Sequence, residues 1–493
     1  MRPLLIYIYI GLILGILFSS GQIENPDTHL RLSQTRIILQ EGKFGLSDDV
    51  GEDLHGNIAI NENGQRYMVY NPGQTIVFIP IYFIARLLCS NEVNAYYCSA
   101  YCVSFLNYFV HALCAFLLFK IALLLGVCKK QSYLASAFFG LTSYSFVFAQ
   151  STYEHHFEMF FILISTYYAL QKKTKNSGLY SGLMLSLGLV FRTTTILAVP
   201  AVLLMQSDNK ERLKVLTTLT IGIGFVLLYN YYRFGNPLES GYSLAWSLAH
   251  SDKFNFWSLA QVPIAFFGFL FSPGKGLIFF STTIVFAFLG IKMFWQKQRL
   301  MFYSIILICV TYLGVFSMNF AWHGSVWSYG PRYILPIIPF IYLPFIYLKP
   351  QKWVFIVMLF AFVLQVELIS VNYKRDVLND YITYSGLSDM EYLYSIKKEP
   401  HLVQAKQLAI ILPKNLGELN NYQPNSPWKK EIRTASNTEV INSSIEKNSI
   451  NFWWVRIFHW KFSLISRIFS VIVLFFTFIG CFMLFKYVKR EII

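Results

Sequence analysis

The chain of 493 residues contains ten apolar runs of about the length that crosses a lipid bilayer, and an eleventh that is broken near its middle. A helix needs about 20 mainly apolar residues to span the hydrocarbon layer. The ten runs cover residues 3–20, 97–127, 131–149, 155–171, 213–232, 276–295, 300–319, 331–349, 353–372 and 463–486. The broken run, 178–206, is interrupted by Arg192 and the three threonines that follow it. These runs predict an all-α polytopic membrane protein.

The composition supports this prediction. Charged residues make up 14% of the chain, against roughly a quarter in soluble proteins. The net charge of +15 would suit a nucleic-acid-binding protein only if the basic residues gathered on one soluble face. They stand instead in small groups between the apolar runs, which argues against nucleic acid as a partner.

The basic groups predict the orientation of the helices, because cytoplasmic loops of membrane proteins are rich in Lys and Arg. The groups are Arg2, Lys129/Lys130, Lys172/Lys173/Lys175, Lys210/Arg212/Lys214, Lys292/Lys297/Arg299, Lys349/Lys352 and Lys486/Lys489/Arg490. If all lie inside, the chain crosses the membrane an even number of times between neighbouring groups. The broken run is then two short helices, 178–190 and 195–206, that meet near Arg192 at the outer face.

The same rule makes one apolar segment of the N-terminal region non-spanning. We choose 75–89, which is short, carries Arg86 and follows the turn Asn71-Pro72-Gly73. The first run has no small-residue cleavage site before Gly21, so we interpret it as a retained helix. About twelve transmembrane helices result, with both termini cytoplasmic in a plasma (inner) membrane.

Three outer loops follow from this topology: residues 21–96, 233–275 and 373–462. The first holds nine of the 26 acidic residues and is expected to be structured around the non-spanning helix 75–89. The last is polar and is expected to form only a small outer-face segment, followed by the final helix and cytoplasmic tail, 463–493.

The seven cysteines indicate no zinc site and no disulfide framework, because none forms a CxxC pair. Nearly all lie in or beside apolar runs. We interpret them as small buried hydrophobic residues.

Ionisable residues at membrane depth are costly and mark functional sites. Most of those outside the basic groups fall at the predicted outer boundary, which points to one outward-facing cavity. They are Asp27, Lys120, Glu154, Glu158, Arg192, Arg233, Lys275, Arg332 and Glu367, with His155, His156 and His323.

Asp27 directly follows the first helix and its short polar connection. A carboxylate at the water boundary suits a general base toward an acceptor hydroxyl. The alternative is that Asp27 caps a helix over 28–41, and from spacing alone capping is favoured.

The segment Tyr153–Glu158 lies at an outer tip and contains two glutamates and two histidines. A divalent metal on Glu154, His155 and Glu158 is one interpretation. Adjacent histidines on a helix point in different directions, however, so hydrogen bonding of a sugar or phosphate by Glu154, His155 and His156 is favoured.

Arg192, Lys275 and Arg332 are cations suited to a lipid-linked phosphate. Lys275 lies in a turn that opens a helix, where free N–H groups favour an anion. The turn lacks the residue order of a Walker A loop, so no nucleotide is expected. Trp327 and Tyr329 are positioned to stack on a sugar, although such residues also gather at membrane interfaces for other reasons.

The order of these segments resembles the GT-C superfamily of integral-membrane glycosyltransferases, in particular polyprenyl-phosphate-sugar-dependent enzymes of the aminoarabinose and protein O-mannosyl transferase type. The resemblance covers residues 1–372. It rests on Asp27 to Gln40 after the first helix and on the segments 64–74 (GQRYMVYNPGQ), 188–195 (GLVFRTTT), 231–238 (YYRFGNPL), 270–277 (LFSPGKGL) and 328–336 (SYGPRYILP).

The resemblance implies a glycosyltransferase of cell-envelope glycan biosynthesis, which transfers a sugar from a polyprenyl-phosphate donor with inversion. Asp27 matches the position of the base. Family members often have a second acidic residue directly after the base, but this chain has Thr28 at that position. Asp27 would therefore act alone or with Glu24. Arg192, Lys275 and Arg332 would surround the lipid phosphate, with Tyr67 and Tyr70 among the substrate-binding residues. No cofactor is required, although a divalent metal is compatible.

Two other functions fit the same topology. A flippase or transporter of lipid-linked oligosaccharides would share the helix count, but such proteins usually contain internal repeats and none is evident. An O-antigen-type ligase or polymerase would use a diphosphate-linked glycan, and the late outer loop 373–462 keeps this alternative open.

Overall fold

The structure is a computed structural model that describes residues 3–47, 50, 57–171, 175–249, 257–324, 329–349, 351–372, 393–417, 449–459 and 463–492. Helices make up almost all of the regular structure in these ranges. The sheet found there is one antiparallel hairpin, β1 (Ile58–Ile60) and β2 (Arg66–Met68), which pairs Ala59 with Tyr67. The chain is therefore helical, as predicted, with a small hairpin that the sequence did not indicate.

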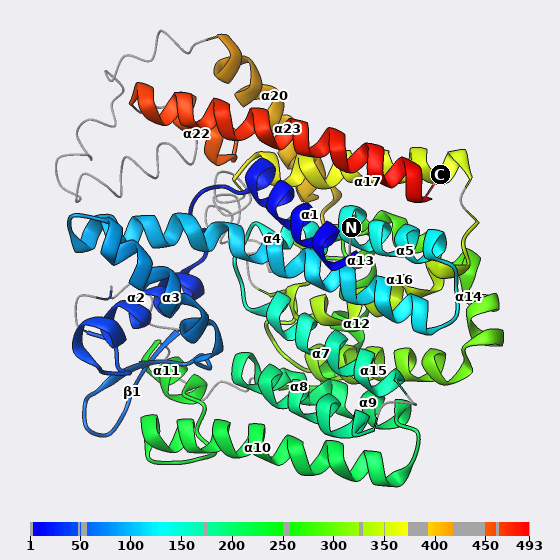
Figure 1. Cartoon of the computed structure of the whole chain (residues 1–493). Helices are drawn as coiled ribbons and strands as arrows, with labels where there is room; N and C mark the ends of the chain where they lie inside the picture. Colours follow the sequence, from blue (N-terminus) through cyan, green and yellow to red (C-terminus); the bar gives the residue numbers. More distant parts are fainter. Residues whose placement is uncertain are drawn as a thin grey trace.

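The first half of the chain forms a layer of neighbouring helices (Figure 1). Its members are α1 (Pro3–Phe18), α4 (Glu92–Leu124), α5 (Lys129–Thr142), α6 (Tyr144–Ala149), α7 (His155–Leu170), α8 (Ser177–Phe191), α9 (Val199–Met205) and α10 (Asn209–Phe234). Helix α4 packs against α1, α5 and α7, and α8 packs between α7 and α10. The run 131–149, predicted as one helix, is two, because the backbone is extended at Ser143.

Small residues allow α8 and α10 to approach closely. A Cβ atom added at Gly222 of α10 would lie 2.6 Å from the Cα of Ser186 on α8. One added at Gly182 of α8 would lie 1.9 Å from Oγ1 of Thr218. Contact of this kind is typical of helices that associate without a hydrophobic driving force.

The predicted break at Arg192 is present. Helix α8 ends at Phe191, Arg192 has an extended backbone, and the 3-10 helix η2 (Thr193–Ala198) leads into α9. The extended residue removes Arg192 from both helices and leaves its side chain available for tertiary contacts.

The second half contains α12 (Val262–Phe271), α13 (Leu277–Phe280), α14 (Ala287–Lys297), α15 (Arg299–Ser317), α16 (Ile338–Tyr342) and α17 (Lys352–Ser370). The 3-10 segments η3 (Leu259–Gln261), η4 (Thr282–Phe286), η5 (Arg332–Ile337) and η6 (Leu343–Tyr347) connect or extend them. The run 331–349 is thus not a regular α-helix, because Pro336, Pro339 and Pro344 remove backbone donors along it.

The segment 233–275, expected to be an outer loop, is partly helical. It contains α11 (Tyr242–Ala249) and the apolar segment Leu259–Phe271, in which α12 packs against α15. We overlooked this segment because its apolar run is short and follows polar residues.

The N-terminal region and α11 together form a cap on the helices. It consists of α2 (Pro26–Glu41), α3 (Gly73–Leu88), the hairpin and α11. In Figure 1 these elements lie at the left of the view, and both chain termini lie toward the right. The described late residues form η7 (Ile396–Lys398), α20 (Pro400–Gly417), α22 (Trp453–His459) and α23 (Leu464–Ile492).

Five helices are long and apolar enough to cross a membrane: α4, α10, α15, α17 and the part of α23 from Leu464 to Leu484. Many large apolar side chains on them are exposed, including Leu228 (70%), Ile356 (68%) and Ile465 (80%). Exposed apolar surface of this extent is unfavourable in water. The described residues therefore agree with a membrane protein, and six shorter apolar helices accompany the five long ones.

Candidate functional site

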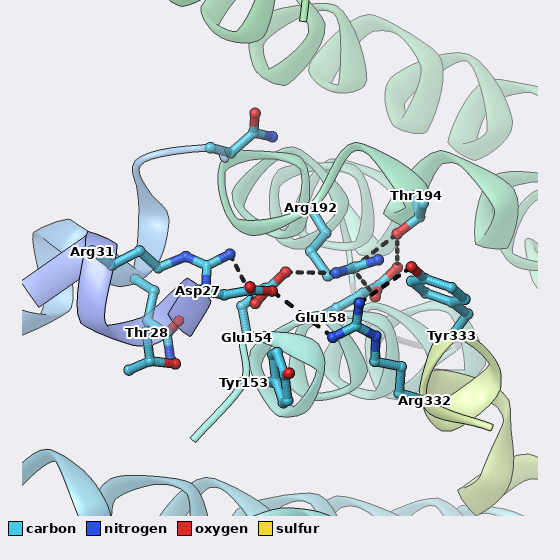
Figure 2. Close-up of polar contacts among 12 residues, drawn as sticks. Asp27, Thr28, Arg31, Tyr153, Glu154, Glu158, Arg192, Thr194, Arg332 and Tyr333 are labelled. Carbon is cyan, nitrogen blue, oxygen red and sulfur yellow. Dashed lines mark hydrogen bonds and ion pairs between the residues drawn. The ribbon is translucent and has the colours of Figure 1, made fainter. Parts of the chain in front are cut away.

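The position of Asp27 is set by the start of α2. The side chain of Asn25 accepts the backbone N–H of Thr28 at 2.8 Å and caps the helix, and Pro26 occupies its first turn. The interpretation of Asp27 as the capping residue is therefore wrong. Because Asn25 takes that role, the carboxylate of Asp27 is directed to the interior of the protein (Figure 2).

Asp27 faces Arg332, which comes from the opposite half of the chain. Its Oδ2 lies 3.9 Å from Nη1 of Arg332, and the two side chains are 11% and 12% exposed. Arg332 also donates from Nη2 to the hydroxyl of Tyr333 at 3.3 Å. A contact as long as 3.9 Å is loose for an ion pair, so Arg332 pairs with this buried carboxylate only weakly.

Glu154 lies between two guanidinium groups. Its Oε2 is 2.9 Å from Nη2 of Arg31, and its Oε1 is 2.5 Å from Nη1 of Arg192. Burial raises the pKa of Glu154, but Arg31 and Arg192 outweigh burial and hold that pKa below its usual value. Glu154 is therefore an ionised, neutralised component of the site and is a poor proton acceptor.

Glu158 is paired on the far side of Arg192. Its Oε2 lies 2.9 Å from Nε of Arg192. Its Oε1 accepts the hydroxyls of Thr194 at 2.6 Å and Tyr312 at 2.8 Å. Arg31, Glu154, Arg192 and Glu158 thus form a row of alternating charges, most of which is visible in Figure 2.

The loop that carries Glu154 is held by buried polar contacts. The carbonyl of Thr152 accepts Thr28 Oγ1 at 3.1 Å and Gln74 Nε2 at 2.7 Å, and Asn107 Nδ2 donates to the carbonyl of Tyr153 at 2.8 Å. Thr152 itself has φ 59°, a conformation that costs energy for a β-branched residue. Contacts from α2, α3 and α4 keep it there and fix Glu154 opposite α2.

Lys275 lies behind Arg332 in the turn between α12 and α13. The lysine is buried, and burial together with Arg332 lowers its pKa to about 7. The turn is held from the late part of the chain, because Gly274 N–H and Ser272 Oγ both donate to the carbonyl of Leu393, at 3.0 and 2.7 Å. A lysine with a lowered pKa gains most from a nearby anion.

Aromatic rings surround the charged groups. The guanidinium of Arg31 lies 4.1 Å from the ring centre of Tyr70, and that of Arg332 lies 4.9 Å from the ring centre of Tyr153. Burial, followed by the charge of Asp27, raises the pKa of Tyr70 well above its usual value. Tyr70 is therefore neutral and able to donate a hydrogen bond beside Asp27.

His155 adjoins the same rings. It is 1% exposed, and within the described residues neither ring nitrogen has a hydrogen-bond partner. Its ring centre lies 5.8 Å from that of Tyr153 and 6.2 Å from that of Tyr333. An unpaired buried imidazole is unfavourable, which supports its predicted role in contacting a ligand.

Other predicted site residues have structural contacts elsewhere. Tyr67 packs against Phe234 under the hairpin, with ring centres 5.9 Å apart. His156 contacts the carbonyl and hydroxyl of Ser145 at 3.0 and 3.2 Å. Tyr329 contacts the carbonyl of Val371 at 3.5 Å. Trp327 lies outside the described residues.

Glu24 is bound to the late part of the chain. Its Oε1 accepts Nδ2 of Asn451 at 2.7 Å, and the same Nδ2 contacts Oε1 of Gln150 at 2.9 Å. Beside them, Arg456 donates from Nη1 to the carbonyl of Ser20 at 2.9 Å. We call Glu24, Gln150, Asn451 and Arg456 the terminal cluster. It ties the connection before Asp27 to residues 449–459.

Sequence reasoning missed Arg31, Thr194 and Tyr312. Arg31 carried a usable signal, because it lies four residues after Asp27 on the same helical face. Its 1% exposure could not be inferred from a helix as polar as α2.

The candidate metal ligands Glu154 and Glu158 have other contacts. In the part of the chain that the structure describes, no group of three or more His, Cys, Asp or Glu side chains is placed to hold a metal ion. Glu154 and Glu158, two of the three metal-ligand candidates, are paired with guanidinium groups instead.

Comparison with known proteins adds no assignment. No protein-family model matches the chain, and no curated protein is significantly similar to it. The geometry of the site is therefore the basis for a functional proposal.

Proposed function

We propose that this protein is a GT-C-type glycosyltransferase that moves a sugar from a polyprenyl-phosphate donor to an acceptor hydroxyl or amine, with Asp27 as general base. The acceptor is a lipid, glycan or protein at the outer face of the membrane. The observation that carries the proposal is the arrangement of the three acids. Glu154 and Glu158 are neutralised by short guanidinium contacts, whereas the charged contact of Asp27 with Arg332 is long, at 3.9 Å.

The charges of the site favour a phosphate ligand. Asp27, Glu154 and Glu158 balance Arg31, Arg192 and Arg332, and Lys275 adds a fourth buried cation behind Arg332. A sugar phosphodiester brings one negative charge, and an anion near Lys275 favours the protonated form of its amine.

In the proposed reaction, Asp27 accepts the proton of the acceptor, and Arg332 and Lys275 stabilise the leaving phosphate. The acceptor oxygen, or nitrogen for an amine, attacks the anomeric carbon while its proton passes to Asp27. The bond between that carbon and the phosphate oxygen breaks, and the phosphate leaves with the bonding electrons. Arg332 and Lys275 then compensate the charge that develops on the leaving phosphate, which is where electrostatic stabilisation is most effective.

The proposed topology is twelve transmembrane helices with both termini cytoplasmic. The five long apolar helices and four of the six shorter ones, Pro3–Phe18, Ser177–Phe191, Thr193–Met205 and Arg332–Tyr347, support it. The cap of α2, α3, the hairpin and α11 would face outward, away from the side on which the termini lie in Figure 1. The site lies at the junction of this cap and the helices.

Asp27→Asn tests the proposal. In membranes from cells that express the full chain, supplied with radiolabelled polyprenyl-phosphate sugars, we expect release of polyprenyl phosphate and transfer of label. Loss of the base should lower this rate by about 100-fold or more, with unchanged binding of polyprenyl phosphate. Asp208→Asn, at the exposed start of α10, is the matched control. Asp27→Asn with wild-type rates would exclude Asp27 as base.

The same assay separates the alternative functions. Movement of labelled lipid across proteoliposomes without a glycosidic product would show a flippase or transporter. Transfer from diphosphate but not monophosphate donors would show an O-antigen-type ligase or polymerase. Either result would contradict the proposed donor.

A further inference from the structure

Three of the seven cysteines gather where α3 ends and α4 begins. The Sγ atoms of Cys89 and Cys98 are 2.9 Å apart, somewhat longer than the roughly 2.05 Å of a disulfide bond. Cys102 lies one helical turn after Cys98. Cys98 and Cys102 are exposed and Cys89 is half-buried, so the sequence-based interpretation of buried small hydrophobic residues is wrong here. It is right for Cys114, which is buried.

Other contacts hold this corner in place. Cys89 ends α3, and its backbone N–H donates to the carbonyl of Ala85 at 2.9 Å. Asn91 caps α4 by accepting the N–H of Asn94 at 2.8 Å. Glu92 is 2.8 Å from Nε of Arg86. The capped ends of α3 and α4 and the Arg86–Glu92 ion pair thus hold the two thiols close together, independently of any bond between the sulfur atoms.

The same contacts place the corner at a polar boundary. Arg86 and Glu92 have side chains that are 45% and 40% exposed, as expected where a helix end meets water. Under the proposed topology, on which this inference rests, that water is on the outer side. Outer compartments are oxidising, and thiol pairs there persist as disulfides.

We propose that Cys89 and Cys98 are joined by a disulfide bond in the membrane-inserted protein. The oxidant is a disulfide-bearing thiol oxidoreductase of the outer compartment. One cysteine thiolate attacks the oxidant disulfide to form a mixed disulfide, and the second displaces the oxidant sulfur. The two thiols lose two electrons and two protons, and the oxidant leaves as a dithiol.

The bond would fasten the helix that supports the site. Helix α3 contacts α2 through Thr35 Oγ1, which donates to the carbonyl of Thr75 at 3.1 Å, and through Arg86 Nη1, which donates to the carbonyl of Leu39 at 3.3 Å. Because α2 carries Asp27 and Arg31, a link from α3 to α4 limits how far this pair of helices can move from the layer below.

Differential alkylation of the full chain in intact cells tests the proposal. Free thiols are blocked with N-ethylmaleimide, and the protein is purified and mapped by mass spectrometry with and without phosphine reduction. We expect a cross-linked peptide that contains Cys89 and Cys98, and alkylation of Cys98 only after reduction. Cys102→Ser should leave the cross-link intact, whereas Cys89→Ser should make Cys98 directly alkylatable.

A membrane-impermeant maleimide distinguishes a failure of the proposed disulfide from a failure of the proposed topology. If Cys89 and Cys98 are alkylated without reduction and from outside, the disulfide is overturned while the outer location of the corner stands. If they are alkylated only after permeabilisation, the topology and the disulfide both fall. A cross-link between Cys89 and Cys102 that survives in Cys98→Ser would overturn the assigned pairing. None of these results depends on the glycosyltransferase activity.

Discussion

Arg332 and Asp27 face each other at 3.9 Å although 304 residues separate them in the chain. Arg332 begins η5, and Asp27 lies in the first turn of α2. A separation larger than that of a close ion pair leaves the carboxylate only loosely paired with the guanidinium group.

Arg332→Gln is expected to weaken binding of polyprenyl phosphate. Loss of one partner of a buried charge contact costs at least about 2 kcal/mol, or about 30-fold in affinity. The measurement is the thermal stabilisation of the purified protein by polyprenyl monophosphate, with uncharged polyprenol as the reference lipid. Arg299→Gln, an exposed arginine at the start of α15, is the control and should bind as the wild type does. Undiminished stabilisation of Arg332→Gln would remove Arg332 from the phosphate site.

Lys275 predicts a pH dependence of donor binding. Its pKa is lowered to about 7, so above pH 7 the lysine must take up a proton to pair with the phosphate. Affinity for a polyprenyl phosphodiester, whose own charge is constant, should therefore fall as pH rises above about 7. Lys275→Arg should abolish that dependence, because arginine stays charged. A flat wild-type profile from pH 6 to 9 would contradict the role of Lys275.

The lowered pKa of Lys275 also predicts how the stability of the protein changes with pH. Because burial holds the folded-state pKa of Lys275 below the ordinary lysine value of about 10.4, the unfolded chain binds more protons between pH 7 and that value. The free energy of unfolding without ligand should therefore rise with pH through this window. Lys275→Met should lose this slope in thermal unfolding measurements.

Asn451→Leu is expected to disturb the connection before Asp27. It removes the hydrogen bonds to Glu24 and Gln150 and leaves a buried carboxylate short of a donor, at about 1–3 kcal/mol. The melting temperature and kcat should both fall, with less effect on binding of polyprenyl phosphate, because the terminal cluster contacts the base side of the site. Asn63→Leu, in the exposed hairpin turn, is the matched control. Wild-type kcat in Asn451→Leu would show that the cluster does not position Asp27.

Two glycines of α10 provide an internally controlled test of packing. Alanine is the better helix former by about 1 kcal/mol, so Gly224→Ala, with open space around its Cβ position, should raise the melting temperature. Gly222→Ala should lower it, because the new methyl group would lie 2.6 Å from the Cα of Ser186. Equal effects at the two positions would mean that α8 and α10 do not pack as described.

The apolar pattern predicted α1, α4, α7, α10, α15, α17 and α23 closely, because a continuous run of apolar residues specifies a long helix. It failed where prolines and short elements divide a run, as at η5, α16 and η6, since hydropathy does not report the backbone conformation. It also missed the hairpin, whose three-residue strands are held by the tertiary contact of Arg233 Nη1 with the carbonyl of Met68 at 2.6 Å.

The site was predicted in part for a similar reason. Asp27, Glu154, Glu158, Arg192 and Arg332 were found because a charge at membrane depth is conspicuous. The pairing of these residues with Arg31 was not predicted, because Arg31 lies in a polar helix and its sequence context is that of an ordinary exposed residue. Glu24 was assigned to the site by its proximity to Asp27 in sequence and Tyr67 through the family resemblance, whereas tertiary contacts direct them to Asn451 and Phe234.

The contact between Glu24 and Asn451 spans 427 residues, which has a consequence for biogenesis. A ribosome that adds about 5–20 residues per second needs roughly 20 to 90 seconds to proceed from one residue to the other. During that interval the connection before Asp27 is already synthesised but lacks its last partners. The contacts of the connection before Asp27 are therefore completed only after Asn451 has been made, so the site of the nascent protein is not fully assembled until synthesis has passed that residue.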